Sequence, residues 1–244
     1  MAEYDTIRSV GVGARAEIDE GLRAHMNKVY GLMSVAMVVT AGVAWAVGSS
    51  EQLFSLLRNP VTGQMTILGW IAMFLPLGMV FAFGALINRM SVGAAQLFFY
   101  AFAGAMGLSL AWIFQVFTGV SIASTFLITA IAFAGLSLYG YVTKRDLSAM
   151  GTFLMMGLIG LLVAMIVNMF LGSEPLAWAI SVIGVLIFAG LTAYDTQNIK
   201  NTYLQHAVHG DVEWLGKAAI MGALNLYMDF INLFMFLLQF FGNR

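Results

Sequence analysis

The sequence predicts an all-α membrane protein, a bundle of seven transmembrane helices, and composition and hydropathy are the reasons. Of the 244 residues, 61% are hydrophobic and 9% are charged, whereas soluble domains contain about 25% charged residues. Apolar runs long enough to cross the hydrocarbon core as an α-helix, about 20 residues, occur seven times. The segments of about 10 alternating residues that form membrane β-barrels are absent from the sequence.

Six of the runs contain no charged residue and the seventh contains one; they are 29–48, 65–87, 92–117, 121–142, 150–171, 176–194 and 218–241. In order, they are separated by a loop that contains Arg58 and by the segments 88–91, 118–120, 143–149, 172–175 and 195–217. The shortest of these connections permit only antiparallel neighbours, so we expect an up-and-down bundle.

Residues 1–28 are expected to form a cytoplasmic segment before a transmembrane domain of residues 29–244. The segment mixes acidic and basic residues and lacks the apolar core of a signal peptide. Apolar residues at helical spacing favour a short amphipathic helix at the membrane interface, with a disordered polar tail as the alternative. These residues are Ile18, Leu22, Met26 and Val29.

The charges of the loops predict the orientation. Nine of the 11 Lys and Arg residues fall in segments on the N-terminal side of the predicted bundle, and two, Arg58 and Arg244, fall on the other side. Because cytoplasmic loops carry an excess of positive charge, we expect a cytoplasmic N-terminus and a C-terminus on the opposite side.

The absence of cysteine excludes disulfides, thiol nucleophiles and thiolate metal sites. The net charge of −1 gives no indication of a nucleic-acid partner. The lipid bilayer is therefore the expected environment, and the function must come from polar residues within it.

Asp229 is the one charged residue well inside a predicted span, about 16 Å from the cytoplasmic surface at roughly 1.5 Å per residue. A carboxylate at that depth costs a few kcal/mol or more unless it has a partner or a water-filled cavity. Asn225 and Asn232 share its face at helical spacing and give the last helix a polar stripe. An interhelical hydrogen-bond seam is the alternative role for this stripe.

Asp195, near the cytoplasmic end of the sixth span, is the expected partner of Asp229, with a depth mismatch that a bent or displaced helix would absorb. If the two carboxyl groups meet, they should share a proton and respond to pH as a pair. Arg89, where the second span reaches the same side, could instead bind Asp195 and close a passage. Simple solvation of Asp195 and a topology role for Arg89 are the alternatives.

Oxygen ligands suit hard cations, so Asp195, Asp229 and the asparagines could form an incomplete Ca²⁺ site that is completed by water. Such a site would hold the ion weakly, as conduction requires. No other cofactor is expected.

Three segments resemble the transmembrane Bax inhibitor motif family, in its bacterial Bax inhibitor-1-like branch. They are Gly140-Tyr141-Val142-Thr143-Lys144-Arg145-Asp146-Leu147-Ser148, Ala193-Tyr194-Asp195-Thr196-Gln197 and Leu226-Tyr227-Met228-Asp229-Phe230-Ile231-Asn232-Leu233-Phe234. Unlike some relatives, the second span carries no acidic residue and reads Leu75-Pro76-Leu77-Gly78.

This resemblance implies a bundle with the last helix at its centre and a pH-sensitive Ca²⁺ leak in a bacterial inner membrane. It also implies that Asp195 and Asp229 are the pH sensor and that Arg89 latches Asp195 in the closed state. A membrane-protein partner such as a protease is a further implication for some members.

Several alternatives stay open, although we expect no enzyme. Tyr194-Asp195 fits one half of an intramembrane aspartyl protease, but Asp229 lacks the Gly-x-Gly-Asp context of the other half. A regulatory membrane protein that binds others and conducts nothing is a second alternative, and a secondary transporter is a third. His206, His209 and Asp211 could bind a metal, but such pairs are common in solvated loops.

Overall fold

The computed structural model describes residues 2–207 and 211–243, with side chains from residue 18 onward. Within these ranges the regular structure is helical, apart from an isolated bridge between Arg58 and Met65. In the described part of the chain, seven helices are long and apolar enough to span a membrane: Ile18–Gly48, Ile67–Arg89, Val92–Val116, Gly119–Val142, Ser148–Leu171, Glu174–His206 and Val212–Phe241. The prediction of an all-α protein with seven spans is confirmed.

Short helices extend or connect these spans. The elements are α1 (Ala2–Gly48), α2 (Glu51–Ser55), α3 (Ile67–Leu86), η1 (Ile87–Arg89), α4 (Val92–Leu110), α5 (Ile113–Val116), α6 (Gly119–Val142), α7 (Ser148–Leu171), α8 (Glu174–His206) and α9 (Val212–Phe241).

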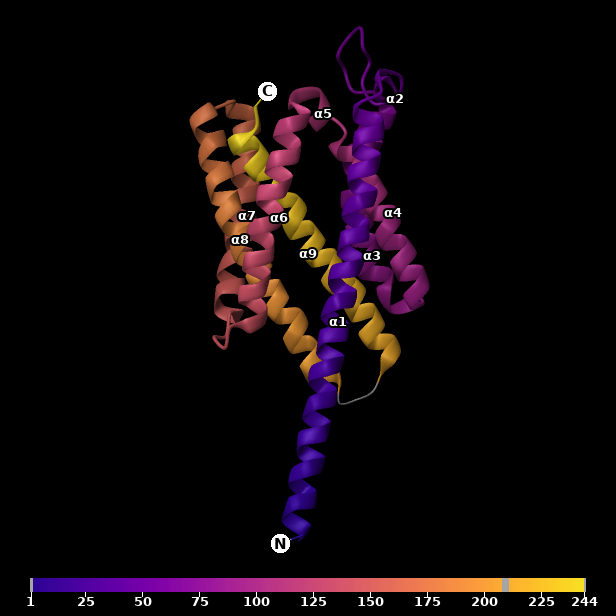
Figure 1. Ribbon diagram of the computed structural model, residues 1–244. Helices are drawn as coiled ribbons and strands as arrows, with labels where there is room; N and C mark the ends of the chain where they lie inside the picture. Colours follow the sequence, from indigo (N-terminus) through magenta and orange to yellow (C-terminus); the bar gives the residue numbers. More distant parts are fainter. Residues whose placement is uncertain (1, 208–210, 244) are drawn as a thin grey trace.

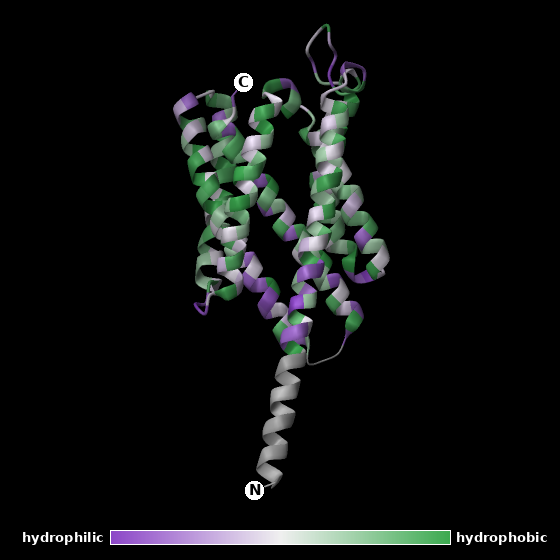
Figure 2. Cartoon of the chain, in the orientation of Figure 1, coloured by the Kyte–Doolittle hydropathy of each residue, from purple (hydrophilic) through white to green (hydrophobic). Residues whose placement is uncertain are grey.

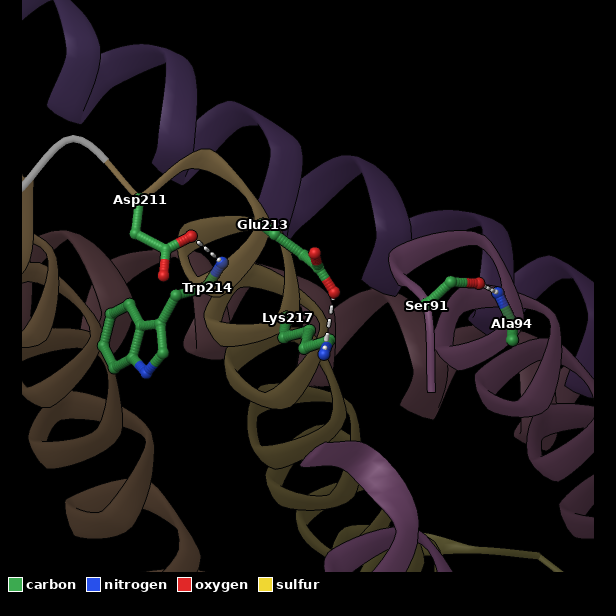
Figure 3. A network of polar contacts seen from close by, with 6 residues as sticks. All are labelled: Ser91, Ala94, Asp211, Glu213, Trp214 and Lys217. Carbon is green, nitrogen blue, oxygen red and sulfur yellow. Dashed lines mark hydrogen bonds and ion pairs between the residues drawn. The ribbon is translucent and has the colours of Figure 1, made fainter. Parts of the chain in front are cut away.

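Most of the spans begin at a residue whose side chain caps the first turn, because the first N–H groups of a helix have no partner within it. Figure 3 shows two such caps, where Ser91 Oγ accepts from the Ala94 amide at 3.3 Å and Asp211 Oδ1 from the Trp214 amide at 2.9 Å. Thr66, Thr118 and Ser173 cap α3, α6 and α8 in the same way. Polar residues in the loops therefore fix where these five spans start.

The helices form two groups that both contact α9. Helices α1, α3 and α4 pack together, as do α6, α7 and α8, and the main contacts of α9 are with α1, α4, α6 and α8. In Figure 1, α9 runs obliquely between the two groups. Its residues are buried on nearly every side from Gly216 to Leu238. A polar side chain on α9 consequently meets other helices, whichever way it points.

The outer faces of the bundle are apolar. Phe81, Phe153 and Phe170 are 71%, 73% and 80% exposed, among many other large apolar side chains. Figure 2 shows hydrophobic residues along the body of the bundle and hydrophilic ones mostly toward its ends. A surface of this kind is stable in contact with lipid and unstable in water, so the chain is an integral membrane protein.

Helix α1 runs without a break from Ala2 through the first span. Leu22, Met26 and Val29 belong to the apolar stripe from which we predict a helix at the membrane interface. In the structure they are buried inside the bundle, each at most 5% exposed. The ring of His25, on the same side, contacts that of Tyr203 of α8 with centroids 4.9 Å apart and the planes tilted by 38°. The stripe therefore has a partner within the protein.

Candidate functional site

Asp229 lies inside the bundle, 17 residues after the start of α9, about 25 Å along the helix axis. Its side chain is 4% exposed. Its neighbours in sequence, Tyr227 and Phe230, are at most 1% exposed, which shows how tightly this part of α9 is enclosed. Asp229 therefore lies well inside one of the seven long helices, as the sequence predicts.

Helix α8 continues for 11 residues beyond Asp195 to His206, past the end of the apolar run 176–194. The longer helix brings Asp195, which is half-buried, to the level of Asp229. The two carboxyl groups lie next to each other, and a hydrogen bond between them requires a proton on one of them.

Among the described residues, this pair has no cationic partner. Within the described residues the single ion pair is Lys217–Glu213, with Nζ and Oε1 3.0 Å apart. Asp229 Oδ2 is buried and has no hydrogen-bond partner in the described chain. A buried carboxyl oxygen without a partner is costly, so the site is suited to binding a proton, a cation or water.

A small pocket of about 240 Å³, which we call the vestibule, lies at the end of the bundle where α9 begins. Its polar lining residues are His25, Asn88, Asn198, Thr202, Lys217 and Asn225. Asn225 is one helical turn before Asp229, and Asn198 is three residues after Asp195. The vestibule therefore leads toward the carboxyl pair from one end of the bundle.

The rim of the vestibule carries the Lys217–Glu213 ion pair, seen in Figure 3 beside the Asp211 cap of α9. Trp214, which also lines the vestibule, stacks on His206 with ring centroids 3.9 Å apart. The Trp214–His206 stack joins the end of α8 to the start of α9, the two acid-bearing helices.

A second pocket of about 530 Å³ lies near the other end of α9 and contains Asn168, Glu174, Ser181 and Gln239. Ser181 Oγ donates to Gln239 Oε1 at 3.3 Å. Gln239 falls seven residues after Asn232, so it continues the polar stripe of Asn225, Asp229 and Asn232. Asn232 itself donates from Nδ2 to the Met228 carbonyl at 2.8 Å.

Between Asn232 and Gln239, α9 is packed tightly against α8. The ring of Phe236 stacks on Phe188 with centroids 5.8 Å apart, and it covers Gly184, where an added Cβ would come within 2.7 Å of the ring. Leu233 is 1% exposed in the same cluster. An apolar constriction thus separates the carboxyl pair from the second pocket.

The comparisons with known proteins identify the family. The family model described as an inhibitor of apoptosis-promoting Bax1 matches residues 22–244. The chain belongs to this Bax inhibitor family. The inner membrane protein YbhL of Escherichia coli K12 is 46% identical over 224 residues, which cover 92% of this chain and 93% of that protein.

Other bacterial relatives match over similar lengths. A protein of Rickettsia prowazekii is 45% identical over 226 residues, 93% of this chain and 92% of its own. A protein of Deinococcus radiodurans is 36% identical over 239 residues, 98% of each chain. The resemblance to the Bax inhibitor family inferred from the three segments is therefore confirmed.

The segments that carry the family resemblance are brought together around α8. Gln197 accepts from the Leu147 amide and donates to the Arg145 carbonyl, each at 2.8 Å. Lys200 Nζ donates to the Tyr141 carbonyl at 2.7 Å. The 143–147 loop of this Bax inhibitor family member is thereby tied to the part of α8 that carries Asp195.

The family resemblance implies that Arg89 latches Asp195 in the closed state. In this structure Arg89 is exposed in η1 and forms no ion pair with Asp195. Its neighbour Asn88 lines the vestibule instead. The sequence reasoning missed His25, Asn88, Asn198 and Gln239. His25 could have been found from its spacing to Leu22 and Val29, and Gln239 from its spacing to Asn232.

The metal site considered for the last loop includes His209, which lies outside the described residues. Among those described, no group of three or more His, Asp or Glu side chains is placed to hold a metal ion. His206, one of its candidate ligands, is engaged with Trp214 and with the Thr202 carbonyl, 3.0 Å from Nδ1.

Proposed function

We propose that this Bax inhibitor family member is a pH-sensitive Ca²⁺ leak pathway in a bacterial inner membrane, controlled by the Asp195–Asp229 pair. One observation carries the proposal: two carboxyl groups lie next to each other inside an apolar bundle, with no Lys or Arg of the described residues paired to them. The inner membrane is the location that the name of YbhL gives for that relative.

The chemistry of the pair supports a response to protons and to calcium. While the two carboxyl groups share a proton, they attract each other and hold α8 against α9. Loss of that proton leaves two negative charges in a low-dielectric site, where they repel each other or attract a divalent cation. Ca²⁺ prefers oxygen ligands, and carboxylates and asparagine side chains supply them.

The arrangement around the pair suits a closed pathway. The vestibule leads toward the pair from one side, and the cluster of Leu233, Phe236 and Phe188 separates it from the pocket at Gln239. Apolar constrictions of this kind block ions until the helices move apart. The latch role of Arg89 stays a prediction that would need η1 to approach α8.

The deciding experiment measures Ca²⁺ entry into indicator-loaded liposomes that contain the purified protein, between about pH 5 and about pH 8. The wild type, Asp195→Asn and Asp229→Asn are compared. We expect flux through the wild type to change with pH, and flux through both Asn variants to lose this dependence, because an amide cannot release a proton.

Asp146→Asn is the matched control, since Asp146 is an exposed acid in the 143–147 loop and caps the Ser148 amide at 2.9 Å. It should keep the pH response of the wild type. Equal pH dependence in all four proteins would refute the role of the pair, and no flux in the wild type would favour a non-conducting regulatory protein. Cleavage of a peptide that requires Asp229 would favour an aspartyl protease instead.

A further inference from the structure

A cavity separate from the carboxyl pair lies between α1 and α6. Its volume is about 560 Å³, and Phe230 of α9 contributes to its lining. Both α1 and α6 pack against α9. We call this cavity the α1–α6 groove.

Polarity changes from one end of the α1–α6 groove to the other. Arg23 and Asn27 of α1 lie at the same end as Tyr141 of α6, because the two helices are antiparallel and are tied by a 2.5 Å hydrogen bond between Tyr30 Oη and Ser137 Oγ. The other end is apolar and is formed by Met33, Met37, Ala130 and Phe133. The groove is therefore amphipathic along its length.

The length of the groove matches one leaflet of a bilayer. Fourteen residues separate Arg23 from Met37, which is about 21 Å along α1. The hydrocarbon of one leaflet is about 15 Å thick, so an acyl chain would fill the apolar part and leave the rest for a headgroup.

The polar end carries positive charge. Arg23 is exposed and forms no ion pair within the described chain. Lys200 lies beside the groove, since its Nζ donates to the Tyr141 carbonyl and is 5.4 Å from the centre of the Tyr141 ring. The described lining contains no Asp or Glu. This end is complementary to a phosphate and would repel a free cation.

The uncharged polar side chains that line the α1–α6 groove differ in whether they already have a hydrogen-bond partner. The hydroxyls of Tyr30 and Ser137 already have hydrogen-bond partners within the protein, because they bond to each other and Ser137 Oγ also lies 2.9 Å from Thr196 Oγ1. Ser34 and Asn27 are exposed and have no hydrogen-bond partner within the described residues, so they can bind the ester and headgroup oxygens of a lipid.

We propose that the α1–α6 groove is a binding site for one membrane phospholipid with an anionic headgroup. Its phosphate lies at Arg23 and Lys200, and one acyl chain lies along Met33, Phe133 and Met37. The site does not depend on ion conduction, and lipid binding is measured independently of flux.

To test the proposal, a bulky side chain is introduced into the α1–α6 groove and the amount of bound lipid is measured. Ala134 lines the groove and is exposed, whereas Ala132 on the same helix is exposed but faces elsewhere. The full-length Ala134→Phe and Ala132→Phe proteins are titrated in detergent with phosphatidylglycerol or phosphatidylcholine, and bound lipid is counted by native mass spectrometry. We expect phosphatidylglycerol to bind Ala134→Phe at least about ten-fold more weakly, and Ala132→Phe like the wild type.

Arg23→Gln tests the headgroup, with Lys28→Gln as the control because Lys28 is exposed on α1 outside the groove. Arg23→Gln should lose the preference for phosphatidylglycerol over phosphatidylcholine, and Lys28→Gln should keep it. Ser34→Phe fills the groove from the opposite wall and replaces Ala134→Phe if that variant does not fold. Equal phosphatidylglycerol binding by the filled, control and wild-type proteins would overturn the proposal.

Discussion

Tyr227, a residue of the family segment that contains Asp229, has the largest fully buried side chain among the described residues. Its hydroxyl lies 2.6 Å from Thr40 Oγ1, and Thr40 donates to the Ala103 carbonyl at 2.8 Å. Phe99 and Phe102 of α4 meet its ring edge-on, with centroids 5.8 Å away. One side chain thus joins α9 to α1 and α4, two residues before the acid.

Replacing Tyr227 by Phe keeps the ring and removes this hydrogen bond. We expect Tyr227→Phe to lower the free energy of unfolding by about 1 kcal/mol, as for other buried hydrogen bonds between membrane helices. Thermal unfolding in detergent measures the loss. Tyr139→Phe, on the exposed face of α6, is the control and should unfold like the wild type. Equal stability of the two variants would contradict the role assigned to the hydroxyl.

At the scale of helices, the position of Asp195 depends on the close crossing of α6 and α8. A Cβ added to Gly140 would come within 2.1 Å of the Ala193 carbonyl oxygen, so only glycine fits there. Close approach at small residues is how membrane helices gain packing energy without a hydrophobic driving force. Gly140 and Ala193 both belong to the segments that carry the family resemblance, which gives those segments a packing role.

Gly140→Ala should therefore force α6 and α8 apart and destabilise the protein by about 1–3 kcal/mol, the usual cost of overpacking. Gly135→Ala is a matched control on the same helix, since a Cβ there meets nothing within 4 Å. That change should leave stability unchanged or raise it slightly, because alanine favours helix formation. The measurement compares the thermal unfolding temperatures of the two variants in detergent. If Gly140→Ala were as stable as Gly135→Ala, the crossing of α6 and α8 would tolerate a methyl group and the prediction would be wrong.

At the scale of the whole molecule, the two ends of the bundle differ in charge. The 143–147 loop and the vestibule rim, at one end, carry Lys144, Arg145 and Lys217, whereas the loop between α2 and α3, at the other end in Figure 1, carries Arg58. Positive charge is retained on the cytoplasmic side, so the vestibule should open to the cytoplasm.

The orientation can be tested directly because the chain contains no cysteine. Thr62→Cys and Ser148→Cys place single thiols at exposed positions near opposite ends without changing any charge. A membrane-impermeant maleimide should label Thr62→Cys from outside the inner membrane. It should label Ser148→Cys only after that membrane is permeabilised. The reverse labelling pattern would place the vestibule on the outer side.

The sequence alone determined the seven spans and the buried position of Asp229, because hydropathy and the length of an apolar run are local properties. It also indicated that Asp195 and Asp229 would meet. Only the tertiary structure decided how they meet, through a helix α8 that runs on to His206. It likewise left Arg89 exposed without an ion pair to Asp195, and created the vestibule and the α1–α6 groove. These features depend on how helices distant in sequence pack against one another, and no local pattern encodes that.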